Sequence, residues 1–493
     1  MAQLFLDAPI LDLPESEHLK NYRANYQKYR MGSSFGAKGE INFVEREGSK
    51  AGESARWQKW VESKGDSTND LAGLDAEEEP ESEGAYALAR DVKIPDHVTK
   101  TDRPLKATFE RAKKMRSEVI VESGIIDNLA ARMPDVIPEI CHRSPIYVVT
   151  DAVTDELFAQ KVFDGLESAG LNVTKFIVES STDASGENST EGFKTLDTFA
   201  ALTDQILAAG VDKRTCIVSV GGGVINNICG FIAGSIYRGV TLIHFSTTMM
   251  GQVDAAIDFK QALNHSCGKN LIGCYYPATR IVLDPECLAT QSKRHLRNGL
   301  AEALKHGIVH STDLLEFILS DDGSGAEYRE GYLDGVVRRT ISVKVPTLTR
   351  YEESDFNEMA PQFGHAPAHA VEFLSWHGGY DCEPILHGEA VAIGMCVSAE
   401  VALIMGVCNA EAVEDIYNAC TAVGLPTTVP KIMNLDDVCA KLAYDKHTLS
   451  GKPTMGLMVA LGDMYHENGA YGIAIEADVL RKAFEINQDR GVA

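Results

Sequence analysis

Short apolar runs alternate with segments of helical periodicity through residues 105–290 of this chain. A short apolar run bounded by polar or turn residues is typical of a strand that is buried on both faces. Such runs predict strands over residues 146–151, 173–178, 216–220 and 241–245. Apolar residues spaced three and four apart predict helices over residues 154–170, 199–209 and 224–236. Alternating strands and helices indicate a parallel sheet, whose ligands bind at the carboxyl ends of the strands.

The pattern changes near residue 290, where strand-like runs fade and helical periodicity dominates. The later segments predict helices over residues 296–310, 332–344, 365–373 and 387–405. We therefore expect an α/β domain over residues 105–290 and a second, mainly helical domain over residues 291–493.

Residues 1–104 have a different composition, with many Gly, Ser and Glu and an acidic run at residues 75–83. Such low hydrophobicity does not offset the entropy of ordering a chain, so we expect an acidic, disordered extension. The alternative is that the basic and aromatic segment at residues 56–60 docks this extension on a surface.

The net charge and the distribution of cysteines limit the partners and the cellular compartment that we expect for this protein. The formal net charge of -25 argues against a nucleic-acid or anionic-membrane partner, although a local cluster of cations can still bind an anionic small molecule. The 11 cysteines are scattered without a CxxC pair, which is typical of core thiols in a reducing compartment. The first residues lack a basic, apolar leader, and no apolar run reaches membrane-spanning length. We expect a cytoplasmic protein, and an organelle address remains open.

Three glycines follow the predicted strand at residues 216–220. Gly221, Gly222 and Gly223 lead directly into a helix, so backbone N–H groups at the helix start are available to a phosphate. The segment lacks the GxGxxG spacing of dinucleotide sites, and a simple tight turn is the alternative.

A second group of residues has the chemistry of a metal site. Glu302 and Lys305 share one helix face, and His365 and His369 share another. His387 opens a further helix. Imidazoles and a carboxylate from several helices suit a divalent transition metal, and spacing alone favours both His365 and His369 as ligands. The alternative is that these are ordinary core or surface histidines.

A third group follows the strand at residues 241–245. It contains Asp254, Lys260, Asn264, Lys269 and Asn270. The lysines and amides suit a phosphate, whereas the alternative is a solvated loop.

Four long motifs, in order, carry a family resemblance. They are GGGVINNICGFIAGSIYRGVTLIHFSTTMMGQVDAAIDFKQALNHSCGKNLIGCYYP, NGLAEALKHGIV, FGHAPAHAVE and LHGEAVAIGM. Together they resemble the 3-dehydroquinate synthase superfamily of sugar-phosphate cyclases, over roughly residues 105–490. The resemblance implies an N-terminal Rossmann-like, parallel-sheet NAD domain and a C-terminal, mainly helical metal-binding domain.

The resemblance also implies roles for individual residues. Glu302, His365 and His387 match the ligands of a catalytic zinc or cobalt ion, so His369 is expected to face the substrate phosphate instead. NAD is expected on Asp151, Glu191, Lys194, Gly222, Gly223, Thr247, Thr248 and the segment from Cys287 to Thr290. Catalytic and substrate-pocket positions are matched by Asp254, Lys260, Lys269, Asn270, Lys305, Lys344 and Lys446. Arg238 matches an arginine that reaches the neighbouring subunit, which implies a homodimer.

The implied reaction has no net redox change. NAD oxidises a ring alcohol, phosphate leaves by elimination, NADH returns the hydride, and the opened ring closes by an aldol step. The substrate is therefore a phosphorylated sugar.

Three positions depart from 3-dehydroquinate synthases. This chain has Asn227 where those enzymes have an aspartate, and Gln362 where they have an asparagine. It has Glu358 where they have an arginine that helps to hold the substrate carboxylate. Because an acid repels a carboxylate, we expect a substrate without one.

Four alternatives follow for the function. Glu358 favours sedoheptulose 7-phosphate, as in C7-cyclitol synthases, although those enzymes typically have proline in place of His369. Asn227 and the KQALN and YYP segments resemble 2-deoxy-scyllo-inosose synthases, which use glucose 6-phosphate. A 3-dehydroquinate synthase and a non-catalytic binding protein are the remaining alternatives.

Overall fold

The structure is a computed structural model of the chain, which divides into two compact units, Met1–Glu110 and Arg111–Ala493. It describes residues 33–35, 41–43, 116–182, 188–265, 268–321, 328–351, 360, 362–442, 448–449 and 452–491. In the first unit these are the antiparallel strands β1 (Ser33–Phe35) and β2 (Ile41–Phe43). The rest of the predicted disordered extension lies outside the described residues.

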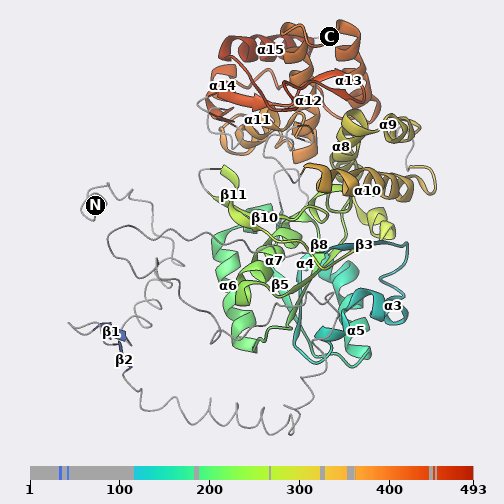
Figure 1. Cartoon of the computed structure of the whole chain (residues 1–493), viewed down its shortest axis with the longest axis vertical. Helices are drawn as coiled ribbons and strands as arrows, with labels where there is room; N and C mark the ends of the chain where they lie inside the picture. Colours follow the sequence, from blue (N-terminus) through green and yellow to red (C-terminus); the bar gives the residue numbers. More distant parts are fainter. Residues whose placement is uncertain are drawn as a thin grey trace, which may run out of the picture. The chain divides into compact units, whose positions relative to one another are not determined.

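A six-stranded parallel sheet forms the first half of the second unit (Figure 1). Its order is β3-β12-β9-β8-β4-β5. The strands are β3 (Glu118–Val121), β4 (Ile146–Asp151), β5 (Val173–Val178), β8 (Cys216–Gly221), β9 (Thr241–Ser246) and β12 (Arg280–Leu283). The predicted parallel sheet is therefore confirmed. The sequence analysis missed β3 and β12, because four-residue strands carry too short an apolar pattern to stand out.

Helices cover both faces of this sheet. They are α3 (Leu129–Val136), α5 (Gln160–Ser168), α6 (Leu196–Ala209) and α7 (Gly223–Ser235). Tyr147 and Val149 of β4 pack in one apolar cluster with residues of α6 and α7, whereas Ile146 and Val148 pack in another with residues of α3 and α5. All six residues of β4 are buried, as expected for a parallel strand between two helical layers.

The strand order reverses between β4 and β8. The chain runs from β4 to β5 on one side, and from β8 through β9 to β12 on the other. At such a switch point the loops leave in opposite directions and open a crevice at the carboxyl ends of the strands. Asp151 ends β4 and Gly221 ends β8, so this crevice lies between them.

The segment around residue 264, for which a solvated loop was the alternative, is a hairpin. It consists of β10 (Lys260–His265) and β11 (Gly268–Tyr275), paired antiparallel. Gly273 is required here, because a Cβ at this position would lie 1.9 Å from the backbone oxygen of Gln261.

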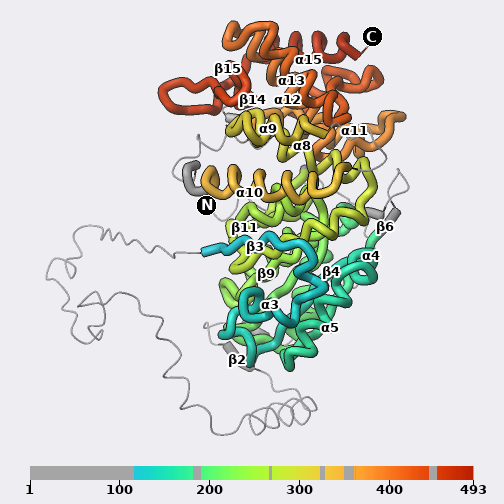
Figure 2. The backbone as a smooth tube through the Cα atoms, turned by 90° about the vertical axis from the view of Figure 1, so that its right-hand side faces the viewer, coloured from blue at the N-terminus to red at the C-terminus, as the bar shows by residue number. Residues whose placement is uncertain are grey.

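The second half of this unit is mainly helical, as the sequence predicts. Its helices are α8 (Lys293–His310), α9 (Thr312–Leu319), α10 (Tyr332–Tyr351), α11 (His365–His377), α12 (His387–Ile404), α13 (Ala410–Ala422), α14 (Leu435–Leu442) and α15 (Ala477–Arg490). Figure 2 shows these helices grouped above the part that contains the sheet, and α10 lies between that part and the other helices. Accordingly, α10 contacts α8 and α9 and also the short turns η8 (Gly251–Ala255) and η9 (Pro285–Thr290).

Short strands also occur in the C-terminal part, where the sequence analysis expected mainly helices. They are β13 (Thr448–Leu449), β14 (Lys452–Met455), β15 (Met458–Ala460), β16 (Asp463–Met464) and β17 (Ile473–Ala474). Their pairing is decided by tertiary contacts, since two to four residues carry little local signal.

Helix α12 is the centre of the helical part and contacts α8, α11, α13 and α15. Contrary to the sequence-based expectation, its length and apolar composition match those of a membrane span. However, 78% of that stretch is buried inside the protein, as in the core helix of a bundle.

Buried His244 makes the fold sensitive to acid. It lies in β9 with no exposed surface, and its Nδ1 is 2.6 Å from Ser219 Oγ. Burial lowers the pKa of His244 to about 3, against about 6.5 in an unfolded chain. The unfolded state therefore binds more protons between these values, so stability falls as the pH drops below 6.5. For this group alone we expect a loss of about 2 kcal/mol between pH 7 and pH 5, measured by urea unfolding.

The matched test is the pH dependence of unfolding in His244→Gln. This variant should lose less stability between pH 7 and pH 5 than the wild type, whatever its absolute stability. The control His466→Gln changes an exposed histidine and should behave as the wild type. An unchanged pH dependence in His244→Gln would contradict the assignment.

Candidate active site

A cavity of about 950 Å³ opens at the carboxyl ends of β4 and β8 and extends to α8, α11 and α12. Most of the site residues predicted from sequence line it. They are Asp151, Glu191, Lys194, Gly222, Gly223, Thr247, Thr248, Asp254, Lys260, Lys269, Asn270, Thr290, Lys305, Gln362, His365, His369 and His387. One cavity therefore joins the predicted cofactor, substrate and metal positions.

The glycine turn forms the sheet side of the cavity. Gly222 precedes the first residue of α7, Gly223 begins the helix, and both line the cavity. The N–H groups of the first helical turn have no partner within the helix, so they are suited to bind an anion there. A Cβ on Gly223 would lie 2.9 Å from Ala255 Cβ, and one on Gly222 would lie 3.0 Å from Thr248 Cγ2. The turn therefore has no room for side chains, and the backbone itself forms the surface, as a pyrophosphate cradle requires.

Other predicted cofactor residues are held by the protein itself. Asp151 Oδ1 accepts hydrogen bonds from the N–H groups of Val153 and Thr154, so this carboxylate caps the turn that starts α4 (Ala152–Thr154). Lys194 Nζ donates to Asn270 Oδ1 at 2.6 Å. Cys287 does not line the cavity, because its side chain is 2% exposed and packs in the apolar cluster that contains α3 and α5. Thr290, from the same turn, does line the cavity.

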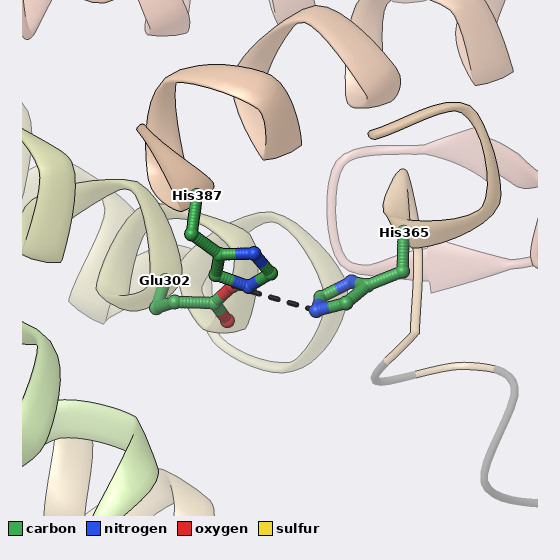
Figure 3. Close-up of side chains that lie close together, drawn as sticks. All are labelled: Glu302, His365 and His387. Atoms are coloured by element: carbon green, nitrogen blue, oxygen red, sulfur yellow. Dashed lines mark ion pairs between the residues drawn. The ribbon is translucent and has the colours of Figure 1, made fainter. Parts of the chain in front are cut away.

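Glu302, His365 and His387 converge from three helices (Figure 3). Glu302 Oε1 is 3.5 Å from His365 Nε2 and 3.5 Å from His387 Nε2. Metal–ligand bonds of about 2.0–2.1 Å at tetrahedral angles separate ligand atoms by roughly 3.4 Å, close to both distances. Glu302 is fully buried, and within the described part of the chain its Oε1 has no hydrogen-bond partner, as expected of a carboxylate oxygen that binds a cation. These three residues fit a divalent metal.

His369 is not part of this cluster, contrary to the expectation from spacing alone. The ligand atoms of Glu302, His365 and His387 all lie within 4.8 Å of one another, and His369 does not belong to this group. Its side chain lines the cavity beside the cluster.

The charges around the cluster favour a bound cation. Burial alone would raise the pKa of Glu302, but Lys305 and the two histidines hold it well below its usual range. Burial, with Lys305 nearby, lowers the pKa of His365 well below its usual value, so its ring is neutral and available to a metal. Although burial opposes it, Glu372 and Glu302 raise the pKa of His387 to about 10. The same carboxylates favour a proton or a metal at this ring.

Glu372 is the most informative residue that the sequence analysis missed. Its Oε2 accepts from His387 Nδ1 at 3.1 Å, and its Oε1 accepts from Lys269 Nζ at 2.5 Å. It follows His365 by seven residues and His369 by three, so helical spacing already places the three on one face of α11.

The substrate side of the cavity is rich in lysine. Lys305 Nζ donates to Glu302 Oε2 at 2.5 Å, and Lys344 forms an ion pair with Asp254. Lys344 lines a smaller, adjoining cavity of about 50 Å³, which it shares with Lys260 and Lys305. Three ammonium groups at one end of a site suit an anionic ligand.

His306, also missed from the sequence, lies in this smaller cavity. It is 2% exposed, and neither ring nitrogen has a hydrogen-bond partner in the residues that the structure describes. Burial, with Lys305 and Lys344 close by, lowers the pKa of His306 well below its usual value.

Three further predicted substrate residues remain: one is placed outside this cavity, and two lie in segments that the structure does not describe. Arg238 is exposed, in a left-handed backbone conformation with φ of 63°, and does not line it. Glu358 and Lys446 lie outside the described residues.

Comparison with known proteins identifies the family. The sequence model of the 3-dehydroquinate synthase N-terminal domain matches residues 186–298, and that of the C-terminal domain matches residues 299–448. The 3-dehydroquinate synthase of Desulforamulus reducens is 32% identical over 319 residues, covering 65% of this chain and 85% of the relative. That of Solanum lycopersicum, described as chloroplastic, is 29% identical over 341 residues, covering 68% and 72%. The chain belongs to the 3-dehydroquinate synthase family.

Solved structures of cyclitol synthases share the fold. The 2-epi-5-epi-valiolone synthase of Streptomyces hygroscopicus, with NAD+ and Zn2+ bound, superposes with a TM-score of 0.65 at 24% identity, covering 78% of this chain and 100% of that one. A 2-deoxy-scyllo-inosose synthase with carbaglucose-6-phosphate, NAD+ and Co2+ has a TM-score of 0.64 at 24% identity, covering 75% and 96%.

Proposed function

We propose that this protein is an NAD- and metal-dependent sugar-phosphate cyclase. The observation that carries the proposal is that one cavity is lined by both histidines of the three-residue metal cluster, by a backbone phosphate cradle and by several lysines. Family membership supports it, because relatives of this chain are 3-dehydroquinate synthases.

The cofactors and the protein side chains have different roles in the proposed reaction. When bound, NAD accepts and returns a hydride, and a zinc or cobalt ion on Glu302, His365 and His387 polarises the reacting alcohol. Lys305 orients the Glu302 carboxylate and adds a positive charge where negative charge develops on the substrate. Lys260, Asn270 and His369, which line the same cavity, are proposed to hold the phosphate.

We further propose that the natural substrate lacks a carboxylate and is sedoheptulose 7-phosphate. In the sequence, Glu358 in place of an arginine removes the positive charge that a carboxylate requires. Gln362, which lines the cavity, supports a hydroxyl in the substrate instead. The Gln362 Oε1 atom is buried and has no hydrogen-bond partner among the described residues, so it can accept a bond from such a hydroxyl.

The experiment is a substrate panel with NAD and Zn²⁺ or Co²⁺, in which phosphate release and the carbocyclic product are measured. We expect kcat/KM to fall in the order sedoheptulose 7-phosphate, glucose 6-phosphate, dehydroquinate precursor. Glu358→Arg should improve turnover of the dehydroquinate precursor at the expense of sedoheptulose 7-phosphate. Efficient formation of 3-dehydroquinate by the wild type would refute this substrate and leave a 3-dehydroquinate synthase.

Binding without phosphate release from any sugar phosphate would favour the non-catalytic alternative. Light scattering tests the predicted homodimer, in which Arg238 would serve the other subunit. The cytoplasmic location also remains a prediction.

A further inference from the structure

We propose that Lys269 and Glu372 are positioning residues that couple the cofactor end of the cavity to the metal cluster. NAD and the metal then bind cooperatively. This inference rests on the proposed function, since it concerns how its two cofactors influence each other.

The coupling follows a continuous chain of ion pairs. His387 Nδ1 lies 3.1 Å from Glu372 Oε2, Lys269 Nζ lies 2.5 Å from Glu372 Oε1, and the same Nζ lies 3.3 Å from Glu191 Oε1. Glu372 is 3% exposed and Lys269 is 22% exposed, so little water screens their interaction. This series of ion pairs begins on the hairpin and on η6 (Glu191–Phe193) of the α/β part, and it ends on a predicted metal ligand.

Glu372 determines how His387 faces the cluster. A carboxylate at Nδ1 holds the proton on that nitrogen and leaves the Nε2 lone pair directed at the metal, which also limits rotation of the ring. Two further bonds fix the approach to α12: Ser375 Oγ accepts from Ile385 N at 3.0 Å, and Trp376 Nε1 donates to Ile385 O at 2.9 Å. The geometry at His387 is therefore set from α11.

Lys269 connects this geometry to the cofactor end. Asn264 Nδ2 donates to Glu191 Oε1 at 2.8 Å, and the backbone N–H of Asn264 donates to Lys194 O at 2.8 Å. These bonds join the hairpin to Glu191 and Lys194, which line the cavity. A ligand that orders this end of the cavity therefore also orders Lys269, and through Glu372 it orders His387. By linkage, the metal must strengthen NAD binding by the same factor.

The test measures Zn²⁺ affinity with and without saturating NAD, by competition with a chelating dye, in the absence of any substrate. In the wild type we expect NAD to tighten Zn²⁺ binding by about 5- to 150-fold. Glu372→Gln should weaken Zn²⁺ binding by about 10- to 100-fold. Lys269→Met should abolish the effect of NAD while both ligands still bind, and Lys269→Arg should restore part of it.

Glu400→Gln is the matched control. Glu400 is also a buried carboxylate, 1% exposed and 2.7 Å from Arg490 Nε, but it lies on α12 away from the cavity. The Zn²⁺ affinity of Glu400→Gln, and the effect of NAD on that affinity, should equal those of the wild type. Independent binding of NAD and Zn²⁺ in the wild type, or an unchanged NAD effect in Lys269→Met, would overturn the inference and leave the proposed function intact. Absence of Zn²⁺ binding in the wild type would instead refute the proposed function.

Discussion

Replacing His387 with alanine should remove the bound metal and reduce kcat by about 10³-fold or more. His387 supplies one of the three ligand atoms in the described group of Glu302, His365 and His387, so its loss leaves two in that group. Metal-ion catalysis supplies several kcal/mol of charge stabilisation, and about 1.4 kcal/mol corresponds to a factor of ten in rate. Metal content is measured by elemental analysis after gel filtration, and kcat by phosphate release. His365→Ala should behave in the same way.

His369→Ala is the internal control for this prediction. It removes a neighbouring histidine that lines the cavity outside the cluster, so metal content should remain while KM for the sugar phosphate rises. Full metal content in His387→Ala, or metal loss confined to His369→Ala, would show that the ligand set is wrong.

Replacing Lys305 with methionine should reduce kcat by about 10²- to 10³-fold while the metal stays bound, because one preorganised charge is lost from the site. Lys305 is 3% exposed and its ammonium pairs with fully buried Glu302. Leaving a buried charge without its partner costs about 3–5 kcal/mol. In the presence of a chelator, Lys305→Met should therefore be less stable than the wild type by about this amount.

Zn²⁺ should restore much of the stability of Lys305→Met, because a cation on Glu302 replaces the missing charge. Urea unfolding with chelator and with Zn²⁺ measures both effects. Lys293→Met, in the first turn of the same helix, should change neither kcat nor the response to Zn²⁺. Equal stability of Lys305→Met and the wild type in chelator would contradict the role of this ion pair.

Local sequence patterns determined much of the α/β fold and of the glycine turn. The apolar runs predicted four of the six parallel strands, and the run at residues 216–220 followed by Gly222 and Gly223 predicted the cradle at the start of α7. These features depend on contacts between residues close in sequence and on the burial of short apolar runs, which a sequence shows directly. The strands β3 and β12 were missed because they are short and their partners lie far along the chain.

The metal cluster shows what only the tertiary structure decided. Helical spacing placed His365 and His369 on one face, yet spacing could not tell which of them meets Glu302, and the family resemblance supplied that choice. The structure shows the reason in the docking of α12 on α8: Gly388 N donates to Asn298 Oδ1 at 2.6 Å, and a Cβ on Gly388 would lie 1.8 Å from Asn298 O. This close approach brings His387 over Glu302. Glu372 acquires its role in the same way, because its partners Lys269 and His387 come from other elements and meet it only when the chain is folded.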